Sequence, residues 1–260
     1  RVLPCNWLQV RENAMDPAHF HYLHTIEGNT GFTWDFIQQG ELDYMETPGG
    51  MVYIDTRRVG DHIWVAISDF LLPAVNPGTD LGEEWTERDG NRPTITSWAV
   101  PIDDTHTMRL GFVRTRRGKV VIREGGFGQT VDRSYEERQQ TPGDYDAQTS
   151  QRPIAVHALE HLVTTDRGVI MLRNLVRRGI REVQNGEDPQ GVGRGDESLI
   201  PTYSQDRILR VPMASSEQED MSSSRTGGDA VLLDKKKCLP VAQEDMASWW
   251  TRTCLLYTSP

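Results

Sequence analysis

The chain has 260 residues, enough for one sizeable hydrophobic core. Its formal net charge is -10 and its pI is about 5.2, which argues against nucleic acid as a partner because phosphate backbones are bound by a surplus of Lys and Arg. The sequence has neither a run of about 18 apolar residues, as a membrane span requires, nor a signal-peptide pattern. We therefore expect a cytoplasmic protein that does not enter a membrane.

The sequence divides into one predicted domain over residues 1–210 and an irregular or disordered tail over residues 211–260. Residues 215–229 have the composition of a disordered linker, and residues 255–260 resemble adapter-derived translation, so no function is expected after Arg252. The three cysteines are far apart and form no C-x-x-C or C-x-H pair. They predict neither a disulfide framework nor a metal cluster.

The first predicted element spans residues 7–24, where good helix formers surround Asp16-Pro17, a pair suited to entering a helix. A short helix should therefore carry the three histidines of this stretch, His19, His21 and His24. From residue 30 to about residue 113 the period changes to two, with many β-branched and aromatic residues. This pattern predicts an antiparallel sheet.

Two hairpins are predicted within the sheet, each from two strand-like runs around a turn signal. Residues 51–59 and 62–72 flank Gly60-Asp61, and residues 94–102 and 107–114 flank Asp103-Asp104. Residues 115–151 are rich in Arg, Gly, Gln and Asp and predict a long functional loop. A helix is then predicted from apolar residues that recur every three or four positions: Val169, Leu172, Val176, Ile180 and Val183.

Residues 12–24 concentrate the side chains that ligate metals, because three histidines lie close to two acidic residues. Two histidines and one carboxylate on one face of an octahedron form the facial triad of non-haem iron oxygenases. At about 100° per helical residue, His21 and His24 are about 60° apart and His19 and His24 about 140° apart. Helical spacing alone favours His21 with His24, and half-exposed histidines on an amphipathic helix are the alternative without a metal.

The pattern Asp16-x-x-His19-x-x-x-x-His24 resembles the D-x-x-H-x-x-x-x-H motif of Rieske oxygenase α subunits. The preceding run CNWLQ, residues 5–9, is similar to the phthalate dioxygenase and dehydrodivanillate O-demethylase branch of that family. The resemblance implies that His19 and His24 are iron ligands and that His21 lies in the pocket or behind the ligands. It also implies that Asp16 links an iron ligand to a Rieske histidine of a neighbouring subunit in a homotrimer.

The third ligand is expected in residues 143–154, which resemble the family segment E-D-x-x-x-Q-x-S-Q-x-P-I. Asp144 falls on the ligand position, and Asp146 is its competitor. The segment departs from the family pattern, since Gly143 replaces an acidic residue and Arg152 stands where a small residue is usual. Asn13 matches a position where some family members have an amide near the iron, but helix capping is the alternative role.

By this resemblance the fold is α+β, a helix-grip in which a curved antiparallel sheet surrounds a long C-terminal helix. The implied activity is activation of O2 at a mononuclear Fe(II), followed by hydroxylation or O-demethylation of an aromatic compound. Electrons would come from NAD(P)H through a reductase or ferredoxin and a Rieske [2Fe-2S] cluster. Because that cluster needs two Cys and two His in paired motifs, which this chain lacks, we expect it in a domain that precedes Arg1.

Two other functions remain open: a helix-grip protein that binds aromatic ligands without redox chemistry, and a hydrolase that holds zinc with the same ligands. A second histidine pair, His157 and His161 around Glu160, is expected to be structural. The basic run 114–119 is either a solvated face or a contact for a partner. Three aromatic residues are candidates for the substrate pocket and equally for the core: Phe36, Trp64 and Phe70.

Overall fold

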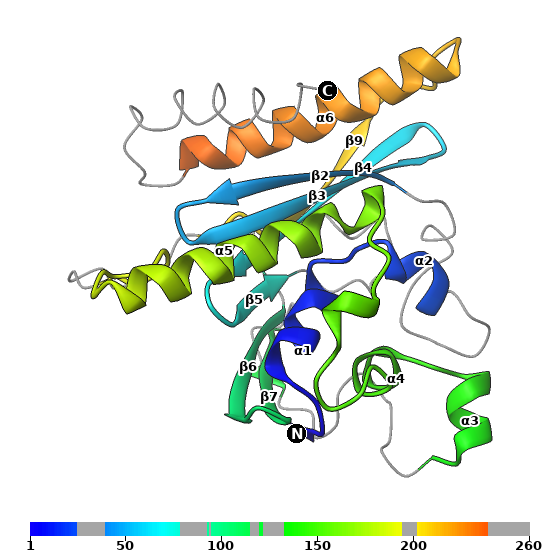
Figure 1. The fold of residues 1–260 in the computed structure, drawn as a ribbon. Helices are drawn as coiled ribbons and strands as arrows, with labels where there is room; N and C mark the ends of the chain where they lie inside the picture. Colours follow the sequence, from blue (N-terminus) through cyan, green and yellow to red (C-terminus); the bar gives the residue numbers. More distant parts are fainter. Residues whose placement is uncertain are drawn as a thin grey trace.

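The computed structural model describes residues 1–24, 40–78, 93, 95–114, 120–121, 133–193 and 202–238. These residues form one curved, nine-stranded antiparallel sheet with helices on both faces (Figure 1). The strands are β1 Val2–Leu3, β2 Glu41–Thr47, β3 Gly50–Val59, β4 His62–Leu71, β5 Val75–Gly78, β6 Ile95–Asp103, β7 His106–Arg114, β8 Val120–Val121 and β9 Gln205–Arg210. Their order is β1-β7-β6-β5-β4-β3-β2, with β8 beside β7 and β9 beside β4.

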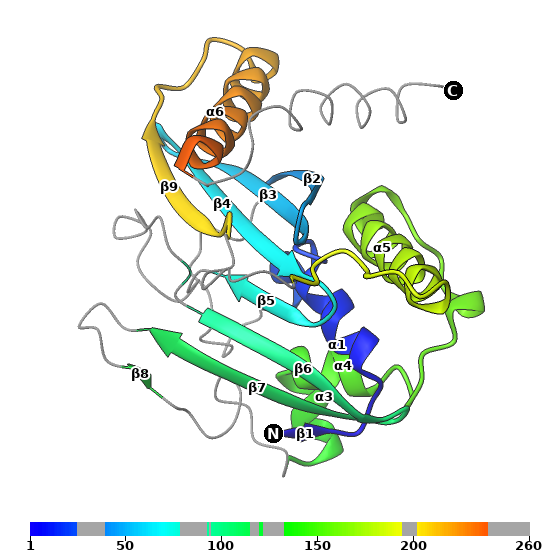
Figure 2. The same cartoon turned by 90° about the vertical axis from the view of Figure 1, so that its left-hand side faces the viewer.

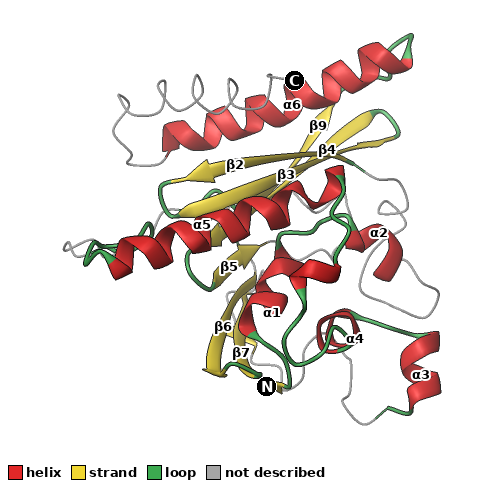
Figure 3. Cartoon of the chain, viewed as in Figure 1, coloured by secondary structure: helices red, strands yellow, loops and turns green. Residues whose placement is uncertain are grey.

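Six α-helices accompany the described part of the sheet (Figure 3). They are α1 Trp7–Ala14, α2 His19–Leu23, α3 Tyr135–Gln140, α4 Asp144–Thr149, α5 Arg167–Gln184 and α6 Glu217–Cys238. The α+β class is therefore confirmed. Among the described helices, none combines the length and the apolar character that crossing a bilayer requires.

Both predicted hairpins are confirmed. Strands β3 and β4 pair from Gly50 with Leu71 to Val59 with His62, and Gly60 in the turn has a φ of 59°. That value lies in the left-handed region, which glycine adopts without steric cost. Strands β6 and β7 form the second hairpin. Local turn chemistry and two-residue periodicity thus place the centre of the sheet correctly.

Strand β3 is buried on both faces. Successive side chains of a strand point to opposite sides, and on β3 the two sides lie in two different core clusters. Met51 and Tyr53 lie in a core cluster with Leu172 and Leu175 of α5. The alternate residues Val52 and Ile54 lie in a second cluster with Val231 of α6. Helix α5 packs on one face of the sheet, against β3, and Figure 2 shows α1 on the same side of the sheet as α5.

The predicted helix over residues 169–183 is confirmed as part of α5, but its apolar stripe is buried only in its first half. Val169 and Leu172 are buried, whereas Ile180 and Val183 have exposed fractions of 52% and 58%. The end of α5 extends past the strands, so these two side chains have no sheet beneath them (Figure 1). Periodicity identified the helix correctly but not the extent of its buried face.

The expectation of an irregular tail is wrong for residues 217–238, which form α6. This helix packs on β3 and β4, with Val231 buried against side chains of both strands and Asp220 paired with Arg58. The composition is poor in apolar residues, and the helix is stabilised by tertiary contacts that a local window does not detect. Residues 239–260 lie outside the described part of the chain.

Gly228 allows α6 to approach the sheet closely, because a Cβ atom there would lie 2.8 Å from Oγ1 of Thr56. We expect Gly228→Val to lower the free energy of unfolding by about 1–3 kcal/mol through overpacking, despite the better helix propensity of valine. Urea denaturation measures the change. Ser222→Val on the exposed side of α6 is the matched control and should change stability by less than about 0.5 kcal/mol. Equal stabilities of the two variants would contradict the close approach.

The prediction of a long loop over residues 115–151 is wrong for Tyr135–Gln140 and Asp144–Thr149, which form α3 and α4. Helix α3 begins with a capping box in which Ser134 and Glu137 satisfy each other's backbone N–H groups. Helix α4 follows directly at Asp144. Phe36 and residues 115–119 of the basic run lie outside the described residues.

Candidate metal centre

The predicted first helix is interrupted, and the interruption positions the histidines. Helix α1 ends at Ala14, and α2 starts at His19, so the expectation of one element over residues 7–24 is wrong. Pro17 lacks a backbone N–H, and the residue before a proline disfavours the helical conformation. The Asp16 carboxylate accepts a hydrogen bond from the Ala18 N–H at 3.1 Å, which stabilises the turn between the helices.

Because of this break, the separation expected on one regular helix does not apply to the histidines. His19 is the first residue of α2, whereas His24 is the residue that ends it. Their ring centroids are 5.2 Å apart, and Phe20 packs against both rings. His19 and His24 can therefore act on the same ligand.

Asp144, the first residue of α4, completes the cluster. Its Oδ1 atom is 3.4 Å from Nε2 of His19 and 3.0 Å from Nε2 of His24. The potential ligand atoms of these three residues all lie within 4.8 Å of one another. Two imidazole nitrogens and one carboxylate oxygen in a largely buried position could hold a divalent metal ion.

The competing carboxylate, Asp146, faces away from the histidines toward basic side chains. Arg133 and Arg138 donate to its two oxygens at 2.6 Å and 2.7 Å, and the Gly143 N–H donates at 3.1 Å. Asp146 therefore anchors α4 to the residues around α3. The structure brings Asp144, rather than Asp146, to the two histidines.

Asn13 and Asp16 both lie beside His19, at different nitrogens of its ring. Asn13 lies in the last turn of α1, which has Asn6 as its N-cap, so the capping role expected as an alternative for Asn13 is wrong. Its Nδ2 donates to Oδ1 of Asp144 at 3.2 Å and lies 3.5 Å from Nε2 of His19. The other ring nitrogen of His19, Nδ1, contacts the Asp16 carbonyl and lies 3.9 Å from the Asp16 carboxylate. An Nδ1 proton directed at Asp16 leaves Nε2 available as a ligand.

Burial and charge act in opposite directions on these groups. Burial alone would lower the pKa of His19, but the hydrogen bond and the negative charge of Asp144 outweigh it and raise that pKa. Burial alone would raise the pKa of Asp144, but hydrogen bonds from His19 and His24 hold it well below its ordinary value. Burial is the main cause that raises the pKa of Asp16.

The affinity for a divalent metal should therefore fall as the pH falls. A metal ligand must be an unprotonated imidazole, and the raised pKa of His19 means that protons compete already above pH 6.5. The same shift stabilises the metal-free chain below pH 6.5, and this stabilisation is lost as the pH rises through the raised pKa. We expect metal affinity to fall up to about tenfold per pH unit below that pKa, in anaerobic titrations between about pH 8 and pH 6. A flat profile would contradict proton competition at His19.

The other predicted candidates lie outside this cluster. Nε2 of His21 is 3.5 Å from Nη2 of Arg57, so His21 faces the sheet rather than Asp144. Trp64 and Phe70 are buried with exposed fractions of 1% and 0%, and both belong to the core. His157 is 3.9 Å from Glu12, which is consistent with the structural role expected for it.

A salt-bridge network of Arg173, Glu12 and Glu160 was not predicted from the sequence. Arg173 of α5 donates to Glu12 of α1 at 2.6 Å and to Glu160 at 2.6 Å. Glu12 precedes Asn13 directly, so the network fixes the helix that carries the Asn13 amide. The residues are far apart in sequence, and no local pattern links them.

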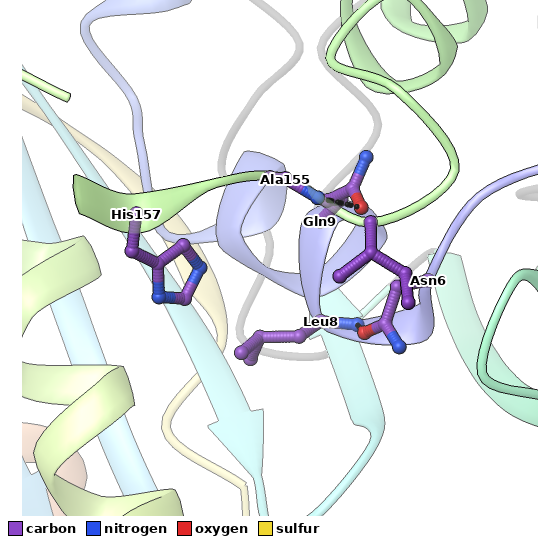
Figure 4. Close-up of a pocket in the computed structure, with 6 residues that line it drawn as sticks. Asn6, Leu8, Gln9, Ala155 and His157 are labelled. Atoms are coloured by element: carbon purple, nitrogen blue, oxygen red, sulfur yellow. Dashed lines mark hydrogen bonds between the residues drawn. The ribbon is translucent and has the colours of Figure 1, made fainter. Parts of the chain in front are cut away.

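A surface pocket of about 380 Å³ lies elsewhere on α1. The pocket is lined by Asn6, Leu8, Gln9, Ile154, Ala155 and His157. Figure 4 shows two of these residues joined by a hydrogen bond, in which the Ala155 N–H donates to Oε1 of Gln9 at 2.9 Å. None of these residues contributes to the cluster of His19, His24 and Asp144.

No family model matches this chain. Curated proteins do match it. The oxygenase subunit of tert-butanol monooxygenase / tert-amyl alcohol desaturase from Aquincola tertiaricarbonis is 33% identical, over 93% of this chain and 57% of that protein. Phenoxybenzoate dioxygenase subunit alpha from Ectopseudomonas oleovorans is 32% identical, over 73% of this chain and 46% of that protein. The 5,5'-dehydrodivanillate O-demethylase oxygenase subunit from Sphingobium sp. is 28% identical, over 80% of this chain and 50% of that protein.

These matches confirm the resemblance predicted from the motifs: the chain is homologous to the oxygenase subunits of Rieske-type oxygenases. It spans about half the length of the curated relatives. A solved structure, the QL mutant of NdmA from Pseudomonas putida CBB5 with caffeine, is also similar, with a TM-score of 0.42 and 15% identity over 76% of this chain and 56% of that chain.

Proposed function

We propose that His19, His24 and Asp144 hold a mononuclear Fe(II) and that the chain is the catalytic part of an oxygenase that hydroxylates or O-demethylates an aromatic compound. The observation that carries the proposal is the convergence of these three side chains, with potential ligand atoms within 4.8 Å of one another. Imidazole and carboxylate ligands suit iron, and three protein ligands on one face leave positions open.

The names of the relatives support the reaction class. Two of them, a phenoxybenzoate dioxygenase and a dehydrodivanillate O-demethylase, are named for aromatic substrates, and another is named for tert-butanol. Two are named as oxygenase subunits, and the phenoxybenzoate protein is named as a dioxygenase subunit alpha. We infer an aromatic substrate for this chain, while the choice between hydroxylation and O-demethylation depends on how the substrate is placed.

When bound, Fe(II) supplies the activation of O2. The protein supplies the positions of the ligand side chains and a negative charge at the metal. Asp144 contributes the negative charge, and Asn13 donates a hydrogen bond to its Oδ1 and so orients the carboxylate. Asp16 orients the His19 ring through Nδ1 and is, in our proposal, the side chain through which electrons arrive from a Rieske centre of a neighbouring subunit.

The remaining components follow from the same proposal. A [2Fe-2S] Rieske cluster would be held by a part of the protein outside residues 1–260, because its paired Cys and His motifs do not occur in this sequence. A reductase or ferredoxin would deliver electrons from NAD(P)H, and the working assembly would be a homotrimer in the cytoplasm.

Binding of nitric oxide to the reconstituted Fe(II) chain tests the proposal, since nitric oxide occupies positions open to O2. We expect a high-spin iron–nitrosyl signal in electron paramagnetic resonance from the native chain and none from Asp144→Ala. A zinc hydrolase would instead be active with zinc bound and would need neither O2 nor reductant. A non-redox ligand-binding protein would bind no stoichiometric metal.

A further inference from the structure

Gln9 of α1 is buried, with an exposed fraction of 3%, and its side-chain amide binds the backbone of residues 148–155 at three points. Its Nε2 donates to the carbonyl of Gln148, in α4, and to the carbonyl of Arg152, each at 3.0 Å. Its Oε1 accepts from the Ala155 N–H at 2.9 Å (Figure 4). Both N–H donors and the acceptor oxygen of the amide are therefore used.

The segment that Gln9 binds contains a backbone conformation that needs outside support. Arg152 has a φ of 77°, in the left-handed region that residues other than glycine seldom adopt. Such a conformation persists only where surrounding contacts hold it. Gln9 binds the chain at Arg152 and at Ala155, and between them the Asn6 N–H donates to the Pro153 carbonyl at 2.8 Å. Helix α1 therefore fixes the path of the chain as it leaves α4.

Two side chains of α1 bind the two ends of α4. Gln9 and Asn13 are four residues apart, so they lie on the same face of α1. Asn13 donates to Oδ1 of Asp144, the first residue of α4, at 3.2 Å. Gln9 donates to the carbonyl of Gln148 in the last turn of the same helix. Together they determine where α4 places the Asp144 carboxylate.

The ion pairs of Asp146 cannot supply this constraint. Arg133 and Arg138 precede α4 directly in the chain, so their contacts hold α4 to its own neighbours around α3. His19 and His24 follow α1 instead. The position of Asp144 relative to the two imidazoles therefore depends on contacts between α1 and α4.

We propose that Gln9 is a positioning residue for the metal centre: by holding the end of α4 to α1, it fixes the Asp144 carboxylate relative to His19 and His24. The inference rests on the proposed function, since it concerns the same ligand set. None of the hydrogen bonds described for Gln9 goes to a ligand side chain, so Gln9 acts through the backbone of α4. Residues that orient metal ligands in this indirect way typically change metal affinity by about 10- to 100-fold.

The iron affinity of Gln9→Met, measured anaerobically on the whole chain, tests the proposal. Methionine is similar in length but cannot form the three hydrogen bonds, so we expect Fe(II) to bind about 10- to 100-fold more weakly. With iron at saturation, the iron–nitrosyl signal should broaden, because Asp144 is no longer held in one position. Gln190→Met is the matched control, since Gln190 donates to the carbonyls of Thr47 and Gly50, outside α1 and α4. It should leave both readouts unchanged.

A second variant covers the case in which Gln9→Met does not fold. Adding Arg152→Gly to it lowers the cost of the left-handed conformation, which glycine adopts freely, without restoring any hydrogen bond of Gln9. The double variant should fold and show the same loss of iron affinity. Native affinity in the double variant would overturn the positioning role.

Hydrogen exchange of the metal-free chain tests the contact without iron. In Gln9→Met the amides of Ala147 and Ser150, which are bonded within α4, should exchange faster, while those of the β3–β4 hairpin keep their rates. Unchanged exchange in α4 would overturn the proposal, as would faster exchange with native iron affinity and an unchanged nitrosyl signal. Absence of iron from the native chain would overturn the proposed function itself, so the two failures are distinguishable.

Discussion

His19→Ala is expected to abolish stoichiometric Fe(II) binding, while His21→Ala should keep about one iron per chain. His19 contributes Nε2 to the cluster with Asp144, whereas His21 faces Arg57 instead. Loss of one of three protein ligands should weaken affinity at least about 100-fold, more than the effect usual for residues that only support a ligand. Metal analysis after anaerobic reconstitution and desalting gives the iron content of each variant.

The comparison is well matched, because both substitutions remove an imidazole from the same turn of α2. Circular dichroism should show the same helix content in both variants, which excludes unfolding as the cause of iron loss. If His21→Ala loses iron and His19→Ala retains it, the pairing favoured by regular helical spacing is correct and the proposed ligand set is wrong.

Asp55→Ala is expected to lower the free energy of unfolding by roughly 3–5 kcal/mol, the largest effect on stability among the substitutions considered. Asp55 and Arg57 lie on the same face of β3, both side chains have exposed fractions of 3%, and Arg57 donates to both oxygens of Asp55. Removing the carboxylate leaves a guanidinium buried without its main partner. Urea denaturation with global fitting measures the change.

Two further variants separate this cause from general damage to β3. The double variant Asp55→Ala/Arg57→Met removes both charges and should recover most of the lost stability. Arg178→Met, at an ion pair with Glu46 whose arginine is 43% exposed, should cost no more than about 1 kcal/mol. A double variant as unstable as Asp55→Ala would show that packing, rather than the unpaired charge, dominates.

The parts of the fold that could be predicted from the sequence are those specified by neighbouring residues. Gly60-Asp61 encodes the turn between β3 and β4 locally, and the recurrence of Val169 and Leu172 encodes α5. Helix α6 could not be predicted, because Gly228 and Val231 stabilise it only through contacts with strands that are distant in sequence. Composition alone indicated a linker there.

The candidate site, too, could be predicted from the sequence only in part. The motif resemblance pointed to His19, His24 and Asp144, and these side chains meet. Spacing could not choose Asp144 over Asp146, since the two lie two residues apart and only the arginines around α3 orient Asp146 away. The sequence contained the cause of the break between α1 and α2, Pro17, but its effect on the ring positions depends on the three-dimensional turn.

The separation of 120 residues between His24 and Asp144 gives the metal a mechanical role as well as a chemical one. An ion held by both would act as a cross-link between the amino-terminal helices and α4, closing a long stretch of polypeptide that includes most of the sheet. Chelation would then release α4 and the adjoining α3 first, since α4 is otherwise held to α1 by a few contacts such as the hydrogen bond from Nε2 of Gln9 to the Gln148 carbonyl. Limited proteolysis would report loss of the ion as new cleavage near residues 133–149, before the hairpins open.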